Sequence, residues 1–184
     1  MANILLAYHT IDGHTRKICE SLQVDLAGRG EHVVVASLLD GDVDPTLYNV
    51  IVIGASIRYG HHNSAVLEFI RAHRALLESK PTGFFSVNLV ARKPDKNTPE
   101  TNPYVGKFLA KARWQPNLVG VFAGSLDYQR CGPADRRIIQ LIMWLTDGPT
   151  DLQAKVDYTD WDEVRSYAGR IAALSAEVDH VLHR

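Results

Sequence analysis

Short apolar runs alternate with helix-like segments along almost the whole chain, and this alternation restricts the possible folds more than any other feature. Each run is long enough for one strand, and none alternates cleanly with polar residues: NILLAY (3–8), HVVVAS (32–37), VIVIGAS (50–56), GFFSVN (83–88) and LVGVFAG (118–124). Strands of this kind are buried on both faces, as in a parallel sheet that helices cover.

The segments between the runs carry apolar residues at helical spacing. The four stripes are Ile18, Leu22 and Leu26; Val66, Phe69, Ile70, His73 and Leu77; Val105, Phe108, Leu109 and Ala112; and Val164, Tyr167, Ala168, Ile171 and Leu174. Parallel neighbours need crossover connections, which are right-handed, so helices are expected on both faces. We predict a single α/β domain with a doubly wound, five-stranded parallel sheet. Residues 125–159 interrupt the alternation before the last helix and are interpreted as an insertion.

Composition excludes several classes of protein. The chain has 184 residues, 20 basic and 21 acidic side chains and a formal net charge of -1, which argues against nucleic-acid binding and against a strongly acidic carrier surface. Cys19 and Cys131 lie in unrelated contexts, so neither a disulfide framework nor a metal site is expected. The first residues lack the features of a signal peptide, and no apolar run approaches a membrane span of about 20 residues. We expect a cytoplasmic protein, at most peripheral to the membrane.

Ligands of open parallel sheets bind beyond the carboxyl ends of the strands, so the loops that follow the strands carry the functional signal. The first loop, in YHTIDGHTRK (8–17), contains Thr10, Asp12, Gly13, His14 and Thr15 directly before a helix. Free backbone amides and hydroxyls at a helix start can surround a phosphate. No dinucleotide or nucleoside triphosphate motif is present, which favours a monophosphate held without a lysine. The alternative is that Thr10 or Asp12 only caps the helix.

Two further loops are polar in the same way. IGASIRYGHHNS (53–64) brings small residues, Arg58, Tyr59 and two histidines after the third strand, and suits a planar ring that lies on backbone with Tyr59 stacked against it. SVNLVARKP (86–94) leaves the fourth strand with Asn88 and adds Arg92 and Lys93. We interpret His61 and His62 either as proton relays or as residues that fill the loop.

These motifs resemble a known family. The Thr10-x-x-Gly13-x-Thr15 turn is similar to the phosphate loop of flavodoxins, which implies flavin mononucleotide (FMN) and a flavodoxin-like strand order of 2-1-3-4-5. The order IGASIRYGHHNS, SVNLVARKP, QLIMWL (140–145) and YTDW (158–161) resembles the bacterial menaquinone-dependent protoporphyrinogen IX dehydrogenases of heme synthesis. The likeness spans essentially the whole chain. DYQRCGPADR (127–136) departs from it by being less aromatic and less basic than that segment usually is.

The resemblance implies a role for each loop. The first loop, Thr10, Asp12, Gly13, His14 and Thr15, would hold the ribityl phosphate. The ring would be bordered on one side by Ser56, Ile57, Arg58, Tyr59 and Gly60, and on the other by Ser86, Val87, Asn88 and Leu89. The redox chemistry would belong to the flavin, so no general acid or base is assigned.

Four basic residues are candidates for binding the carboxylates of a porphyrinogen: Arg58, Arg92, Lys93 and Arg130. Arginine pairs bidentately with carboxylates, which makes the three arginines better candidates than the lysine. The alternative is that these charges are solvated residues at the rim of the site.

A helix is predicted over residues 133–146, with Pro133 at its start and Gly148 and Pro149 beyond its end. Its apolar arc comprises Ile138, Ile139, Leu141, Ile142 and Leu145, opposite Arg136, Arg137 and Gln140. The helix either lies at a membrane surface, where a lipid-soluble quinone would be met, or packs on its own domain.

We therefore expect an FMN-dependent dehydrogenase that oxidises protoporphyrinogen IX and reduces menaquinone or another quinone. Two alternatives remain. The first is a flavodoxin-type electron carrier, which the balanced charge disfavours because such carriers are acidic. The second is a quinone reductase that uses NADH or NADPH.

Overall fold

A computed structural model describes residues 2–41, 43–130, 132–145 and 148–182. Five strands form one parallel sheet: β1 (Asn3–His9), β2 (His32–Ser37), β3 (Val50–Arg58), β5 (Thr82–Val87) and β6 (Leu118–Phe122). They are arranged β2-β1-β3-β5-β6, and the short strand β4 (His61–His62) pairs antiparallel with the end of β3. Among the five parallel strands this is the predicted order 2-1-3-4-5, so the fold class is confirmed.

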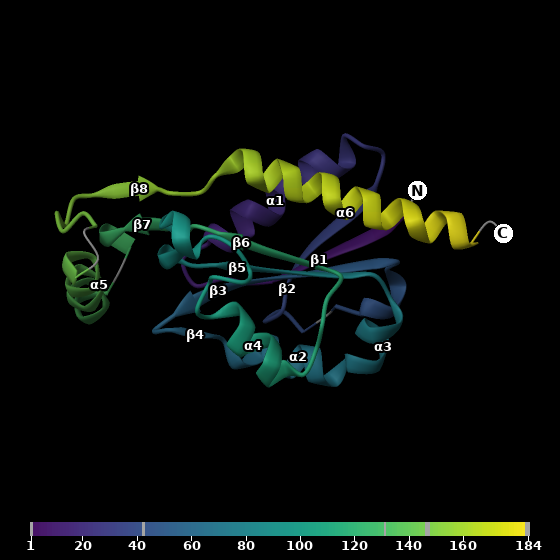
Figure 1. The fold of residues 1–184 in the computed structure, drawn as a ribbon, viewed down its shortest axis with the longest axis horizontal. Coiled ribbons are helices and arrows are strands. Elements are labelled where there is room, and N and C mark those ends of the chain that lie inside the picture. Colours follow the sequence, from purple (N-terminus) through teal and green to yellow (C-terminus); the bar gives the residue numbers. More distant parts are fainter. Residues whose placement is uncertain (1, 42, 131, 146–147, 183–184) are drawn as a thin grey trace.

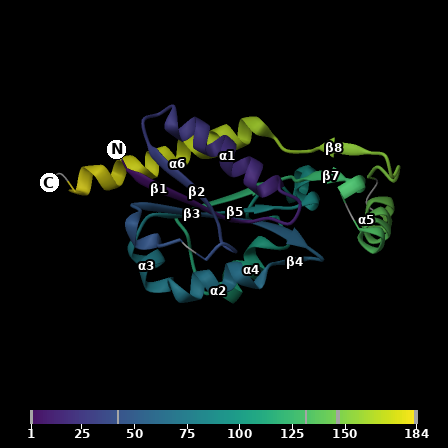
Figure 2. The ribbon, with the colours of Figure 1, turned by 180° about the vertical axis from the view of Figure 1, so that it is seen from behind.

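Helices cover both faces of the sheet (Figures 1 and 2). On one face lie α1 (His14–Ala27) and α6 (Trp161–Leu182), and on the other α2 (Ser64–Ala72), α3 (Arg74–Ser79) and α4 (Val105–Ala112). Short 3-10 helices occur at η1 (Pro45–Leu47), η2 (Leu89–Arg92), η3 (Pro94–Lys96) and η4 (Tyr128–Arg130). The predicted apolar stripes therefore lie on helices that face the sheet.

Alternate residues of the strands feed two separate cores, as the period of two in a strand requires. In β1, Leu5 and Ala7 pack with the α2–α4 layer, whereas Ile4 and Leu6 pack with α1 and α6. All four side chains are fully buried. Burial of a large apolar side chain is worth about 1.5–3 kcal/mol, so the two cores anchor the carboxyl ends of the strands in fixed positions.

The stripe predicted from Val66 to Leu77 is divided between two helices. The chain leaves helical geometry at His73, with φ -109° and ψ 18°, and this residue ends α2 and precedes α3. The ring of His73 packs on that of Phe69 at a centroid distance of 4.7 Å. Both helices keep their apolar residues toward the sheet.

Residues 125–157 form a small unit beyond the carboxyl edge of the sheet, at the end opposite to the two chain termini (Figure 1). Strand β7 (Ser125–Asp127) pairs antiparallel with β8 (Lys155–Asp157), and α5 (Pro133–Leu145) lies between them in sequence. Leu126, Tyr128 and Met143 form a third core. Helix α5 agrees with the predicted helix up to Leu145, and residue 146 lies outside the described residues.

No helix within the described ranges is both long and apolar enough to cross a membrane.

Candidate functional site

The first loop leaves the start of α1 without a side-chain cap. Gly13 is the N-cap residue, with φ 82° and ψ -4°, and no side chain accepts a hydrogen bond there. This left-handed conformation favours glycine because it has no Cβ. The N-cap position is therefore occupied by Gly13, and not by Thr10 or Asp12. The backbone N–H groups of the first turn remain available to an anion.

Three buried hydroxyl groups around this turn have no hydrogen-bond partner within the described part of the chain. They are Thr10 Oγ1, Thr15 Oγ1 and Ser56 Oγ. A buried polar atom without a partner costs about 1–3 kcal/mol, so native proteins rarely keep several together. All three residues line one cavity. The arrangement fits a ligand that supplies hydrogen-bond acceptors.

The cavity, of about 390 Å³, joins the loops after β1, β3 and β5. The sequence-predicted residues on its lining are Thr10, Asp12, His14, Thr15, Ser56, Ile57, Arg58, Tyr59, Gly60, Val87, Asn88, Leu89, Arg92 and Lys93. Gly13 and Ser86 are not on the lining. Most of the residues predicted from the three loops are thus brought together at the carboxyl edge of the sheet.

The loop after β3 is a tight hairpin that presents an aromatic ring. Tyr59 and Gly60 both have positive φ, 50° and 80°, and connect β3 to β4 as a two-residue turn. Such a pair of angles is typical of a type I′ turn, in which a non-glycine residue is strained. The side chain of Tyr59 is 59% exposed and lines the cavity. The turn therefore holds an exposed ring in a defined place.

The loop after β5 is fixed by a buried polar network. Ser86 Oγ lies 2.9 Å from His62 Nε2 and accepts from Asn88 Nδ2 at 3.2 Å. Asn88 Oδ1 accepts from Ala91 N at 3.0 Å and from Asn102 Nδ2 at 3.2 Å. Ser86 thus acts beneath the cavity, whereas Asn88 lies on its surface.

His62 is a neutral, packed ring. Its ring centroid lies 4.4 Å from that of Phe108 and 5.5 Å from that of Phe84. Burial, with a smaller contribution from His61, lowers the pKa of His62 to about 3. A group that stays neutral down to this pH holds Ser86 in place and is a poor proton relay near pH 7.

The candidate basic residues occupy different positions. Arg58 forms an ion pair with Asp12 at 3.4 Å and another with Asp135 of α5, and the hydroxyl of Tyr59 also donates to Asp135. Arg92 donates to the carbonyl of Leu89 at 2.9 Å and lies on the cavity with Lys93. The side chain of Arg130 lies outside the described residues.

The structure adds lining residues that the loops alone do not indicate. Helix α5 covers the cavity with Ile138, Ile139, Ile142 and Met143. The remaining additions are Val90, Lys96, Pro103, Tyr104, Gly124 and Ser125. The predicted apolar arc includes Ile138, Ile139 and Ile142 but not Met143. No local pattern places these residues on the cavity, because their position depends on packing over a long sequence distance.

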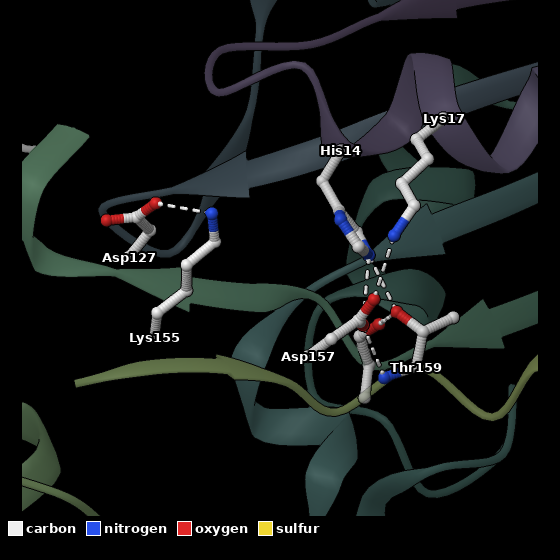
Figure 3. Close-up of polar contacts among 7 residues, drawn as sticks. His14, Lys17, Asp127, Lys155, Asp157 and Thr159 are labelled. Carbon is white, nitrogen blue, oxygen red and sulfur yellow. Dashed lines mark hydrogen bonds and ion pairs between the residues drawn. The ribbon is translucent and has the colours of Figure 1, made fainter.

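A second polar cluster joins the first loop to the junction between β8 and α6 (Figure 3). His14 Nε2 lies 2.6 Å from Thr159 Oγ1 and 3.6 Å from Asp157 Oδ1, and Lys17 Nζ lies 3.1 Å from Asp157 Oδ2. Burial acts to raise the pKa of Asp157, but hydrogen bonds from Thr159 and Lys17 and the nearby His14 keep it below its ordinary value. The cluster fixes the start of α1 against the segment that follows β8.

Among the described residues, no three or more His, Cys, Asp or Glu side chains come together in a group that would hold a metal ion. Cys19 is a free, buried thiol, and burial raises its pKa, so it is not poised as a nucleophile. Cys131 lies outside the described residues.

Comparison with known proteins agrees with the geometry. A sequence profile of the flavodoxin domain matches residues 5–153. Two structures share the fold at low identity: a WrbA-like flavodoxin from Agrobacterium tumefaciens (13% identity, 96% of this chain and 99% of that chain, TM-score 0.53) and the flavodoxin of Megasphaera elsdenii (14%, 64% and 84%, TM-score 0.51).

The closer sequence matches carry one name. Protoporphyrinogen IX dehydrogenase [quinone] of Escherichia coli K12 is 45% identical over 173 residues, which are 93% of this chain and 95% of the relative. The protein of the same name from Leishmania major is 44% identical over 95% of this chain and 76% of its own length. The chain contains a flavodoxin domain and matches these relatives along almost its entire length. It therefore belongs to the protoporphyrinogen IX dehydrogenase (quinone) family.

Proposed function

We propose that the protein is an FMN-dependent dehydrogenase that converts protoporphyrinogen IX to protoporphyrin IX. The substrate loses six electrons and six protons in three two-electron steps, and three molecules of menaquinone or another respiratory quinone are reduced to quinol. The observation that carries the proposal is the 45% identity over 93% of the chain to enzymes named for this reaction. A cavity at the carboxyl edge of the sheet supports it, because its lining includes buried hydroxyl groups without a partner among the described residues.

The residues of the three loops fit FMN. Gly13 and the amides at the start of α1, with Thr10, His14 and Thr15, would hold the phosphate. Ser56, Ile57, Arg58, Tyr59 and Gly60 would border one side of the ring, and Val87, Asn88 and Leu89 the other, with Ser86 holding Asn88 from beneath. Asp12 would keep Arg58 at the rim through their ion pair. The bound flavin would supply the two-electron redox chemistry, while the chain binds, orients and shields it.

The carboxylates of the substrate would meet cations at the same rim. Arg92 and Lys93 line the cavity, and Lys96 joins them there. Arg58 already pairs with two carboxylates of the chain, so a substrate carboxylate would have to replace Asp135 to reach it. Arg130 stays a prediction from the resemblance alone.

We further propose that α5 meets a membrane surface, and that residues 125–159 are an insertion in a single domain that serves this contact. The sequence left two alternatives for α5, packing within the protein or contact with a membrane surface. The two alternatives apply to different faces of the helix. Met143 is buried in the third core with Leu126 and Tyr128, whereas Leu141, Trp144 and Leu145 are 56%, 68% and 66% exposed. An exposed apolar stripe beside the cavity suits access to a quinone dissolved in lipid.

Flotation with vesicles that contain anionic lipid tests the membrane contact. Trp144→Asp is expected to reduce the fraction of protein that floats with the vesicles. Leu39→Asp is the matched control, because Leu39 is 63% exposed but does not lie on α5. Equal flotation of both variants and the wild type would contradict the contact through α5.

The function is tested by anaerobic turnover. Protein loaded with FMN is mixed with protoporphyrinogen IX and a menaquinone analogue, and porphyrin fluorescence is followed. Fluorescence should rise with the wild type and much more slowly with Tyr59→Ala. Equal, background rates for both proteins would favour an electron carrier instead. Reduction of the bound flavin by NADH or NADPH, without porphyrin formation, would favour a quinone reductase.

A further inference from the structure

The His14 side chain contacts the segment that follows β8 and also lines the cavity. His14 is the first residue of α1, and its side chain is 12% exposed. Nε2 is engaged by Thr159 and lies near Asp157 (Figure 3). The ring therefore connects the proposed phosphate site to the segment that follows β8.

The hydrogen bonds define which nitrogen carries the proton. The hydroxyl group of Thr159 has one hydrogen, which it donates to the carbonyl of Ala123 at 2.9 Å. At 2.6 Å, His14 Nε2 must then be the donor and Thr159 Oγ1 the acceptor. In the neutral ring Nδ1 is consequently an unprotonated acceptor. Among the described residues, Nδ1 has no hydrogen-bond partner.

Without a ligand, the surroundings of His14 favour the neutral ring. Burial lowers the pKa of His14, Asp157 raises it and Lys17 lowers it. Arg16 lies on the same turn and pairs with Glu20 at 2.8 Å. Across the cavity, Arg58 is paired with Asp12. The positive end of α1 also opposes a charge on the ring.

An anion at the start of α1 would reverse this balance. A phosphate monoester carries about -1.5 to -2 charges at neutral pH, more than the roughly +0.5 at a helix start. An unprotonated Nδ1 would repel an acceptor oxygen of the phosphate, whereas a protonated Nδ1 would donate to it. Asp157, at 3.6 Å from Nε2, stabilises the imidazolium from the other side.

We propose that His14 is a proton-linked phosphate ligand: the ring takes up one proton from solvent at Nδ1 when a phosphate ester binds at the start of α1, and donates that proton in a hydrogen bond to the ester. The inference rests on the proposed cofactor. It explains how a loop without a lysine supplies a positive charge to the phosphate only when the phosphate is present.

Titration calorimetry tests the linkage. FMN is titrated into wild type and His14→Gln at about pH 7 in two buffers with different heats of ionisation, which gives the number of protons taken up. Glutamine can still donate to Thr159 but cannot ionise. The wild type is expected to take up more protons per FMN than the variant, by a difference that approaches one. Raising the pH from about 6.5 to 8.5 should weaken FMN binding more in the wild type than in the variant. The extra loss of affinity is at most about tenfold for each unit by which FMN binding raises the pKa of His14.

Two comparisons separate the possible outcomes. Riboflavin lacks the phosphate, so its binding should cause the same proton uptake in both proteins. In a separate NMR experiment, inorganic phosphate added to the wild type should move the ¹⁵N resonance of His14 Nδ1 toward the value of the protonated ring. Equal proton uptake with FMN in both proteins, or an unmoved Nδ1 resonance, would overturn the role of His14 and leave the cofactor in place. Failure of the wild type to bind FMN would overturn both, whereas FMN binding without porphyrin formation would overturn only the proposed reaction.

Discussion

Among single residues, His62 is expected to make the free energy of unfolding depend on pH. Its pKa lies at about 3 in the folded protein and near 6.5 in the unfolded chain. Between these values the unfolded chain binds a proton that the folded protein does not. The free energy of unfolding should therefore fall as the pH falls, by about 1.4 kcal/mol per pH unit from this group.

His62→Gln is the matched variant, because glutamine can keep the hydrogen bond to Ser86 and cannot titrate. Urea unfolding between about pH 6 and pH 4 should show a shallower loss of stability for the variant than for the wild type. His9 and His14, whose pKa values burial also lowers, remain in both proteins and cancel in the comparison. Parallel pH profiles would contradict the buried, neutral state of His62.

Gly54 provides a second prediction for a single residue. A Cβ added to Gly54 would overlap the ring of Phe85 on the neighbouring strand, whereas one added to Gly106 of α4 would meet nothing within 4 Å. Gly54→Ala should lower the free energy of unfolding by about 1–3 kcal/mol through overpacking. Gly106→Ala should leave it unchanged or raise it by up to about 1 kcal/mol, since alanine favours a helix. Thermal unfolding of the two variants checks this contrast. Equal stabilities would argue against the close packing of the Phe85 ring on Gly54.

Among the elements, α5 depends on a small core of its own. Met143 is fully buried with Leu126 and Tyr128. Met143→Ala should destabilise this unit by about 2–5 kcal/mol, because it removes apolar contacts and leaves a cavity. The two main cores contain none of these three residues. In the variant, limited proteolysis within residues 125–159 should therefore be much faster, while the midpoint of global unfolding changes little.

Ile171→Ala, in the fully buried face of α6, is the control for this experiment. It should lower the midpoint of global thermal unfolding without selective cleavage in residues 125–159. If Met143→Ala lowers the global midpoint as much as Ile171→Ala and produces no selective cleavage, α5 is not a separately stabilised element.

The elements also show where sequence reasoning succeeds and where it ends. The five buried strands are predictable because a run such as residues 50–55 is apolar on both faces, and the loops after them follow from topology. Strand β4 and the β7–β8 pair contain only two or three residues each, too few for a periodic pattern. The break at His73 leaves the apolar spacing intact, so the pattern cannot reveal it.

In the candidate site, the hydroxyl-rich loop is visible in the sequence because Thr10, Gly13 and Thr15 lie together in the chain. Tyr104 and the α5 residues on the cavity are far from these loops in sequence and reach them only through tertiary packing. The link between His14 and Thr159 spans 145 residues and has no local signature. Local chemistry was therefore predictable, and contacts between distant segments were not.

At the scale of the whole molecule, we propose that the parallel sheet presents a site for the phosphate of FMN at its carboxyl edge. Thr15 is 0% exposed, and its hydroxyl lacks a partner among the described residues. Replacing it with valine keeps the shape of the side chain and removes the hydroxyl. The variant should be as stable as the wild type or more stable, by up to about 1–3 kcal/mol, because an unpaired buried group is lost.

The most direct measurement is a flavin titration of wild type and Thr15→Val, followed by quenching of flavin fluorescence, with FMN and with riboflavin. A hydrogen bond to a charged group is worth about 1.5–3 kcal/mol, so FMN binding should weaken roughly tenfold to a hundredfold in the variant, while riboflavin binding stays the same. Equal FMN affinities for the two proteins, or a wild type that binds riboflavin as tightly as FMN, would contradict a phosphate site at the start of α1.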